Sequence, residues 1–224
     1  MRRLLVFDVN ETLLDLGALD GLFAAAFGDA AARREWFAQT LQSALVLTVT
    51  GQYRDFTEIG AAALAMVAAR RGVPLDPTLP WALRDRMLQL PPHPDAAPAL
   101  DRLRDAGFRL AALTNNPQPV VDAQLTNADL RDRFERVLSV DGPRRLKPAP
   151  EVYRYAASEL RVPIAGLRLI AAHSWDVTGA MRAGAAAAFI ARPGQILDPL
   201  GETPDIIAPD LVAAADALVS GGRE

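Results

Sequence analysis

Four short apolar runs, each followed at once by polar residues, constrain the fold of this chain more than any other feature. The runs cover residues 4–7, 110–113, 167–172 and 186–191. Short, largely apolar runs of this length are typical of strands that are buried on both faces. Helical patterns precede or separate the last three runs, most clearly over residues 96–106 and 150–160. Short strands that alternate with helices predict an α/β protein with a parallel sheet and right-handed crossovers.

Polar side chains follow the first three runs at the points where the strands end. Ligands of an open parallel sheet bind beyond the carboxyl ends of its strands, which all lie at one edge. We therefore expect the polar residues at that edge to converge on one site: Asp8, Asn10, Thr114, Asn115, His173 and Asp176.

The stretch between the first and second runs does not follow this alternation. Its pattern is helical from Leu19 to Leu90, with breaks at Gly51, Gly72 and residues 74–80. Helices inserted after the first strand predict a cap subdomain over residues 16–91, above the edge of the sheet. Residues 1–15 and 92–224 then form the core domain. The prolines of residues 91–94 resist helix continuation, so we expect the hinge back to the core there.

Composition excludes several kinds of chemistry. The chain has no cysteine, which removes disulfides, thiolate metal sites and cysteine nucleophiles. His93 and His173 are its only histidines, so a multi-histidine metal centre is excluded as well. The formal net charge is −3 and there is no basic tract, so we expect no nucleic-acid partner.

The distribution of apolar residues predicts a soluble, cytoplasmic protein. The longest alanine-rich stretches are well short of the roughly 20 apolar residues that a membrane span requires. Two arginines in residues 1–3 precede an apolar run, as in a secretory signal. That run ends at Asp8, whereas a signal peptide needs about 7–15 apolar residues.

Four candidate catalytic positions each have a structural alternative when they are taken alone. Asp8 ends a strand, where a carboxylate serves as nucleophile, base or metal ligand, or simply caps a helix or turn. Thr114 and Asn115 form either an Asx turn or an anion site. Lys147 is either functional or a solvated charge, and Asp176 by itself is typical of a helix N-cap.

The order of these positions along the chain is similar to that of the haloacid dehalogenase superfamily of hydrolases. That superfamily has a nucleophilic Asp with Thr four residues later, then Ser or Thr, then Lys before Pro, and last an acidic motif. The matching residues here are Asp8, Thr12, Thr114, Lys147 and Asp176. The resemblance spans nearly the whole chain. It implies a Rossmann-like core, with a parallel sheet flanked by helices and an inserted helical cap.

Two positions separate the branches of this superfamily. Phosphatases carry a second Asp two residues after the nucleophile and a metal-binding acid four residues before the last motif. This chain has Asn10 and Ala172 there, and an amide cannot supply a proton to a leaving alcohol. The branch without both features is the type II 2-haloacid dehalogenases, and further segments resemble it: residues 51–56, 147–153, 173–180, 192–194 and 200–205. It implies neither metal nor cofactor.

The resemblance implies a two-step hydrolysis of a short 2-haloalkanoic acid to a 2-hydroxy acid and halide. Asp8 displaces the halide and forms an aspartyl ester, which water activated by Asp176 then hydrolyses. Lys147 keeps Asp8 ionised, and Thr12 positions it. Eight further residues are candidates for substrate binding: Asn10, Phe37, Phe56, Thr114, Asn115, Tyr153, His173 and Trp175.

The chain also departs from the dehalogenase pattern. Phe37 stands where an arginine of the first cap helix guards the substrate, although Arg33 and Arg34 lie one turn away. Ala171 and His173 replace the usual Ser and Asn of the last motif. Two other functions therefore stay open, an atypical phosphohydrolase and a catalytically weak binding protein. The resemblance also implies a homodimer.

Overall fold

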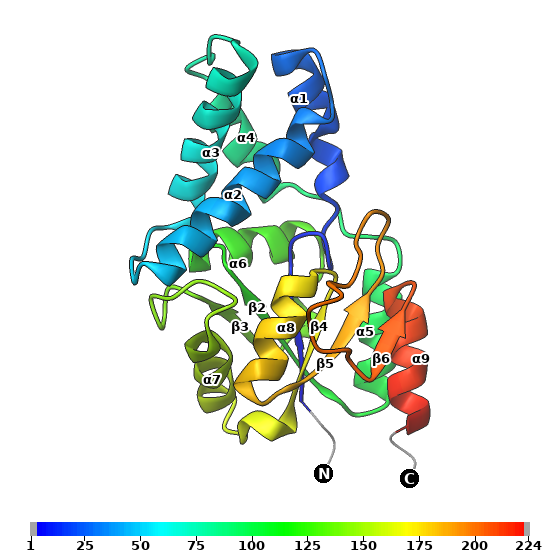
Figure 1. Cartoon of the computed structure of the whole chain (residues 1–224). Coiled ribbons are helices and arrows are strands. Elements are labelled where there is room, and N and C mark those ends of the chain that lie inside the picture. Colours follow the sequence, from blue (N-terminus) through cyan, green and yellow to red (C-terminus); the bar gives the residue numbers. More distant parts are fainter. Residues whose placement is uncertain (1–3, 222–224) are drawn as a thin grey trace.

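A six-stranded parallel sheet forms the centre of the computed structural model, which describes residues 4–221 (Figure 1). Residues 1–3, which entered the prediction of location, and residues 222–224 lie outside the described part. The strand order is β3-β2-β1-β4-β5-β6, and every neighbouring pair is parallel. The strands are β1 (Leu4–Phe7), β2 (Arg109–Thr114), β3 (Arg136–Ser139), β4 (Leu167–Ala171), β5 (Ala186–Ile190) and β6 (Ile206–Ala208).

The four predicted strands are confirmed to within one residue at each end, and they form the middle of the sheet. The sequence patterns missed β3 and β6, which are the two edge strands. Both are short, and each keeps an exposed residue, Arg136 in β3 and Ile207 in β6. An edge strand lacks the continuous apolar run of a strand that is buried on both faces, so its signal in the sequence is weaker.

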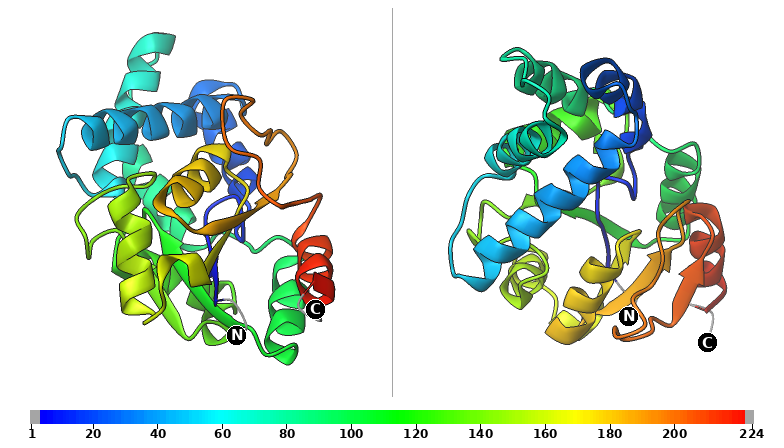
Figure 2. Two further views of the ribbon diagram at one scale, coloured as in Figure 1. Left: turned by 60° about the horizontal axis from the view of Figure 1, so that its bottom comes forward. Right: turned by 45° about the horizontal axis from the view of Figure 1, so that its top comes forward.

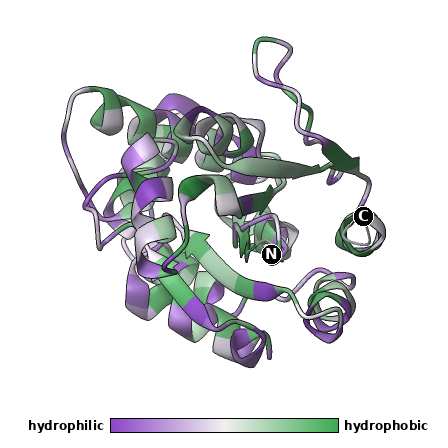
Figure 3. Ribbon diagram, turned by 90° about the horizontal axis from the view of Figure 1, so that it is seen from below, coloured by the Kyte–Doolittle hydropathy of each residue, from purple (hydrophilic) through white to green (hydrophobic). Residues whose placement is uncertain are grey.

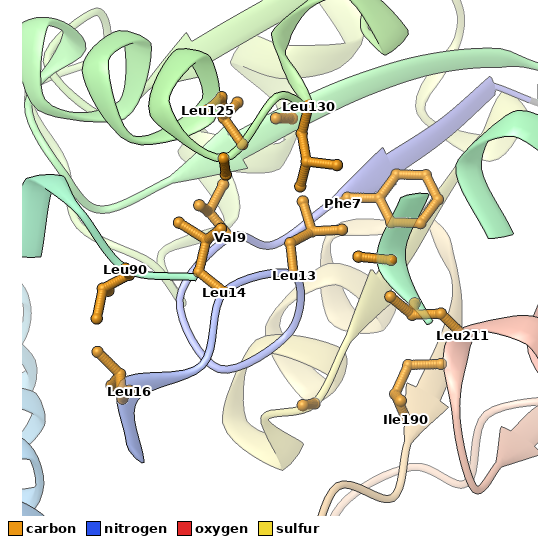
Figure 4. Packing of buried hydrophobic residues seen from close by; sticks show 14 of the residues in the cluster. Phe7, Val9, Leu13, Leu14, Leu16, Leu90, Leu125, Leu130, Ile190 and Leu211 are labelled. Carbon is orange, nitrogen blue, oxygen red and sulfur yellow. The ribbon is translucent and has the colours of Figure 1, made fainter. Parts of the chain in front are cut away.

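Alternate residues of each central strand supply two separate hydrophobic clusters, one on each face of the sheet. Leu5 and Phe7 of β1 point to one face, and Leu4 and Val6 point to the other. The first face is covered by α5 (Ala96–Asp105), α6 (Gln118–Asn127) and α9 (Leu211–Gly221), and Figure 4 shows Phe7, Leu125 and Leu211 in its cluster. The second face is covered by α7 (Pro150–Glu159) and α8 (Ser174–Ala183).

The predicted helices over residues 96–106 and 150–160 are therefore confirmed as α5 and α7, each ending one residue early. Short 3-10 turns complete the core: η2 (Arg131–Arg133) and η3 (Ile164–Gly166). Figure 3 shows hydrophobic residues along the central strands, between helices that carry hydrophilic residues as well. Within residues 4–221, no helix is long and apolar enough to cross a membrane.

A group of helices stands above the carboxyl ends of the strands (Figures 1 and 2). It consists of η1 (Leu16–Leu19), α1 (Asp20–Phe27), α2 (Ala32–Val49), α3 (Phe56–Arg71) and α4 (Leu79–Leu88). The predicted break at Gly72 is the left-handed residue that ends α3, with φ of 65°. Gly28 ends α1 in the same way, a break that the patterns did not identify.

The two connections between this group and the sheet run side by side. The backbone N–H of Asp15 donates to the carbonyl of Pro91 at 2.9 Å, and that of His93 donates to Leu13 at 2.8 Å. We propose on this arrangement that residues 16–91 form a cap subdomain and that residues 1–15 and 92–224 form the core domain. Limited proteolysis that cuts first inside either unit, rather than near residues 16 and 91, would contradict the division.

Candidate active site

Asp8 lies at the carboxyl end of β1 and is the centre of a buried hydrogen-bond network. Its backbone N–H donates to Ile170 at 3.0 Å, which extends the ladder between β1 and β4 by one residue. Its Oδ1 accepts from Nζ of Lys147 at 3.1 Å, and its Oδ2 accepts from Oγ1 of Thr12 at 2.8 Å. Oγ1 of Thr12 in turn accepts the backbone N–H of Ala172 at 3.0 Å, which directs the hydroxyl proton toward Asp8.

Lys147 joins the two carboxylates that the sequence singled out. Its Nζ lies 3.1 Å from Oδ1 of Asp8 and 2.8 Å from Oδ2 of Asp176. The side chain is only 1% exposed, so the ammonium requires both partners to offset its lost hydration. The backbone N–H of Lys147 donates to Oδ1 of Asn115 at 2.9 Å. This bond connects the lysine loop, residues 140–149 between β3 and α7, to the end of β2.

Asp176 is fully buried in the first turn of α8. Besides Lys147, it accepts a hydrogen bond of 2.6 Å from the hydroxyl of Tyr153 on α7. The two helices approach closely because Gly179 has no side chain. A Cβ at Gly179 would lie 2.5 Å from Cβ of Pro148 and 2.7 Å from the hydroxyl of Tyr153.

His173 completes the network on the other side of Asp8. Its Nδ1 lies 3.1 Å from Oδ2 of Asp8, and its Nε2 lies 2.8 Å from Oε2 of Glu11. Its ring stacks on that of Trp175, with the ring centroids 5.2 Å apart. The ring of Phe37 also lies beside it, with a centroid distance of 5.8 Å. Both ring nitrogens of His173 thus face carboxylates.

The electrostatics of the two aspartates differ, although they share one lysine. Burial opposes ionisation of Asp8, but Lys147 and His173 outweigh it and hold the pKa of Asp8 well below its usual range. Burial and the charge of Asp8 raise the pKa of Asp176 above its usual value, in spite of Lys147. Burial lowers the pKa of His173, yet its bonds to Asp8 and Glu11 prevail and raise that pKa to about 9. Carboxylates with separated pKa values are typical of a nucleophile and a base.

The remaining polar candidates lie beside this network. Oγ1 of Thr114 accepts the backbone N–H of Asn116 at 3.1 Å. Oδ1 of Asn10 accepts hydrogen bonds from the side-chain amides of Asn116 at 3.4 Å and Gln124 at 3.3 Å. The patterns did not identify Asn116, Gln124 or Glu11. Asn116 lies beside Asn115 in the same turn, a signal that was available, whereas Gln124 sits within α6 and has no local motif.

An apolar cavity of about 560 Å³ lies between α2, α3, α4 and the start of α6. Two predicted residues line it, Phe37 and Phe56, together with residues of the cap and of the β2–α6 loop such as Trp36, Trp81, Leu83, Met87, Asn116 and Pro117. The cavity borders the network at two points, because Phe37 packs on His173 and Asn116 bonds Asn10. Trp175 lines a different hollow, with Pro148 and Arg182.

Neither arginine near Phe37 lines this cavity. Arg33 is buried and forms ion pairs with Asp20 and, at 3.6 Å, with Glu11. Arg34 is exposed to solvent. Of the two arginines, Arg33 thus reaches the edge of the Asp8 network through Glu11 rather than the cavity beside Phe37.

The residues at the sheet edge do not fit a divalent cation. The position of the phosphatase metal-binding acid is the buried methyl group of Ala172, and the cation between Asp8 and Asp176 is the ammonium of Lys147. Within residues 4–221, no group of three or more Asp, Glu or His side chains is arranged to hold a metal ion.

Known proteins resemble this chain over most of its length. The model of a family of haloacid dehalogenase-like hydrolases matches residues 3–169. An (S)-2-haloacid dehalogenase of Pseudomonas putida is 29% identical and aligns over 96% of this chain and 97% of its own. A haloacetate dehalogenase of Moraxella sp. (strain B) is 31% identical over 82% and 80% of the two chains.

The fold agrees as well. The L-2-haloacid dehalogenase of Xanthobacter autotrophicus superimposes with a TM-score of 0.91 at 26% identity, over the full length of both chains. A second structure of that enzyme, with chloropropionic acid covalently bound, superimposes with a TM-score of 0.90 at the same identity and coverage. The family match covers well over half of this chain, and its order of motifs agrees with the geometry of the site. The chain belongs to the haloacid dehalogenase-like hydrolases.

Proposed function

We propose that this protein is a hydrolytic dehalogenase, which converts short 2-haloalkanoic acids to 2-hydroxy acids and halide. The observation that carries the proposal is the pairing of Asp8 with Lys147, with Asn10 rather than an acid two residues later. A halide leaves without a proton, so this site can break a carbon–halogen bond without a general acid. The names of the relatives from Pseudomonas, Moraxella and Xanthobacter support the same reaction.

In the first step, Asp8 attacks C2 of the substrate from the side opposite the halogen. The carboxylate supplies the electron pair of the new C–O bond, and the halide leaves with the pair of the broken bond. Lys147 keeps Asp8 ionised and Thr12 orients it, so a nucleophile is present at neutral pH. A single displacement inverts the configuration at C2.

In the second step, water attacks Cγ of the Asp8 ester, and Asp176 accepts its proton. The raised pKa of Asp176 suits this role, because a more basic carboxylate is a better proton acceptor. Tyr153 fixes the position of Asp176 through the 2.6 Å hydrogen bond. The product leaves with an oxygen from Asp8, which regains one from water.

The substrate carboxylate is assigned to Thr114 and Asn115. Oδ1 of Asn115 is occupied by Lys147, which leaves its amide N–H groups as donors for a carboxylate. The apolar end of the substrate is assigned to the cavity beside Phe37 and Phe56. Trp175 packs behind His173 and Asn10 bonds α6, so both act on the shape of the site.

The test is halide release from L-2-chloropropionate without added metal, compared between the wild type and Asp8→Ala. Release falls by about four orders of magnitude in the variant, because the nucleophile is lost. Asp105→Ala, which removes an exposed aspartate at the end of α5, is the matched control and keeps full activity. Absence of release from a folded wild type would contradict the proposed function.

We also propose a cytoplasmic location and a homodimer, which the family resemblance supports. Cell fractionation tests the location. Light scattering at micromolar concentration tests the dimer, and a mass near the 24.1 kDa of one chain would contradict it.

A further inference from the structure

Glu11 is a charged residue of the site to which the proposed reaction gives no role. It lies in the turn after β1, three residues beyond the nucleophile, with a backbone φ of 61°. Residues other than glycine adopt such left-handed conformations rarely, and they concentrate at functional sites. Oε2 of Glu11 lies 2.8 Å from Nε2 of His173.

The two carboxylates around His173 define its protonation. Nδ1 faces Oδ2 of Asp8 and Nε2 faces Oε2 of Glu11, and the imidazole is 96% buried, with only 4% of its surface exposed. A neutral imidazole carries one N–H, so one of its nitrogens would direct a lone pair at a carboxylate. The imidazolium, with two N–H groups, satisfies both contacts. Hydrogen bonds with these carboxylates raise the pKa of His173 to about 9, against the effect of burial.

The two oxygens of Asp8 have different surroundings. Oδ1 accepts one hydrogen bond, from Lys147, whereas Oδ2 accepts two, from Thr12 and His173. Donors fixed before the reaction around one oxygen are the arrangement that stabilises an oxyanion in acyl transfer. In the Asp8 ester, this geometry identifies Oδ1 as the oxygen bonded to the substrate and Oδ2 as the carbonyl oxygen.

We propose that His173 and Thr12 form the oxyanion site for hydrolysis of the Asp8 ester, and that Glu11 is the positioning residue that keeps His173 protonated. This inference rests on the proposed function. Its central point is a change of charge: once Asp8 is esterified it is neutral, and Glu11 is then the carboxylate that still holds the imidazolium. The cation is therefore retained for the step in which Oδ2 becomes negative.

The step is balanced as follows. The oxygen of water bonds to Cγ, the carbonyl pair moves to Oδ2, and Asp176 takes one proton of the water. The tetrahedral centre then restores the Cγ=Oδ2 bond and breaks Cγ–Oδ1, and the leaving oxygen takes a proton from Lys147. Lys147 recovers that proton from Asp176, 2.8 Å away. The new carboxylic acid of Asp8 releases its proton to solvent.

The charged groups around His173 come from each element packed against it: Asp8 and Glu11 after β1, Arg33 on α2, Lys147 before α7 and Asp176 on α8. Arg33 lies 3.6 Å from Glu11, and Gln195 donates to the same carboxylate at 3.1 Å. These two contacts hold the Glu11 carboxylate in place when Asp8 loses its charge.

The experiment separates the two chemical steps in Glu11→Gln, which keeps the size of the side chain and removes its charge. Rapid quench with L-2-chloropropionate measures halide release in the first turnover, and intact-protein mass spectrometry measures the ester. We expect first-turnover release within about threefold of wild type, ester hydrolysis slowed about 10- to 100-fold, and accumulation of the ester. As pH rises, the variant loses ester hydrolysis at a lower pH than the wild type does, because its imidazole gives up the proton sooner. Glu159→Gln, a surface acid at the end of α7, is the control and changes neither step.

A second readout is independent of turnover. The chain has two histidines, so NMR of the imidazole protons with His93→Gln as an assignment control isolates His173. Its titration midpoint falls by about one pH unit or more in Glu11→Gln. His173→Asn keeps one amide donor for Asp8 but carries no charge. It therefore retains part of the ester hydrolysis that His173→Leu loses. These two variants carry the test if Glu11→Gln does not fold.

The outcomes separate this inference from the function on which it rests. An inactive, folded wild type overturns the proposed dehalogenase and the ester step with it. If the wild type is active but Glu11→Gln leaves the titration midpoint of His173 and the level of the ester unchanged, the inference is overturned and the proposed function stands. Equal slowing of halide release and ester hydrolysis also overturns it, because that result indicates general distortion of the site.

Discussion

The edge of the sheet and the cavity under the cap differ in almost every physical respect, although they border each other. At the sheet edge, buried charged groups are paired at 2.8–3.1 Å. Asp8 follows the end of a strand and Asp176 lies in the first turn of a helix, while Lys147 lies in the loop before α7. The cavity is lined mainly by apolar side chains of three cap helices. Phe37 is the contact between the two regions, with its ring 5.8 Å from that of His173.

This difference indicates that the two regions have separate functions, the sheet edge in the chemical steps and the cavity in the choice of substrate. Positions of charged groups at the sheet edge are set by backbone hydrogen bonding of β1, β2 and β4, which tolerates little change. The shape of the cavity is set by side chains such as Trp81 and Met87, which can vary without moving the backbone. Changes at the edge should therefore affect chemistry and stability together, whereas changes in the cavity should affect the choice of substrate.

Lys147→Met is expected to have the largest effect, because it removes the cation that two buried carboxylates share. We expect halide release to fall at least about 1000-fold and the free energy of unfolding to fall by about 3–5 kcal/mol. Urea denaturation with a halide assay measures both. Arg136→Met, which breaks a surface ion pair with Glu159, costs only about 0–1 kcal/mol. Similar losses of stability and halide release in the two variants would contradict the special role of the charged groups at the sheet edge.

The pH dependence of stability tests the buried imidazolium. The pKa of histidine is about 6.5 in the unfolded chain and about 9 for His173 in the folded one. The folded state therefore binds this proton more tightly, so the added stability is fully present below pH 6.5 and is lost as pH rises through 9. We expect a loss of roughly 3 kcal/mol across that window. Denaturation at several pH values measures it, and a wild type no steeper than His173→Asn would refute the assignment.

Gly179→Ala tests how closely α8 must approach the lysine loop and α7. Alanine usually stabilises a helix relative to glycine, but here its Cβ would lie 2.5 Å from Pro148 and 2.7 Å from Tyr153. We expect a loss of about 1–3 kcal/mol and a 10- to 100-fold slower reaction, because Asp176 shifts with the helix. Gly21→Ala in α1, where nothing lies within 4 Å, is the matched control and should be neutral or stabilising. Thermal denaturation and kcat distinguish the two variants.

Trp81→Ala is expected to have the smallest effect, and one limited to substrate choice. Trp81 is 64% exposed and lines the cavity, so its loss should change stability by no more than about 0.5 kcal/mol. We expect KM for a 2-bromo acid with a longer alkyl chain to rise about threefold, through lost apolar contact. The kinetic constants for L-2-chloropropionate should stay unchanged. A fall in kcat for both substrates would indicate that the cap takes part in the chemistry.

The amino-acid sequence was enough to predict the central part of the fold and the main members of the site. Short, largely apolar runs identified β1, β2, β4 and β5, because a strand buried on both faces is built mainly from apolar residues. Parallel strands bring their carboxyl ends to one edge, which placed Asp8 and Asp176 together, and the family resemblance added Lys147 to them. The sequence patterns missed the edge strands β3 and β6, because partly exposed strands lack a continuous apolar run.

The pairing of these side chains depends on packing in three dimensions, which the sequence patterns do not report. Glu11 and His173 are 162 residues apart, and no local pattern indicates that their side chains meet at 2.8 Å. The same holds for Gln124, which reaches Asn10 from the middle of a helix. Local patterns report the burial of a residue and the path of the backbone around it. Partners of a buried charge are set by packing between distant elements, and these partners determine whether an imidazole beside Asp8 is a neutral group or a cation.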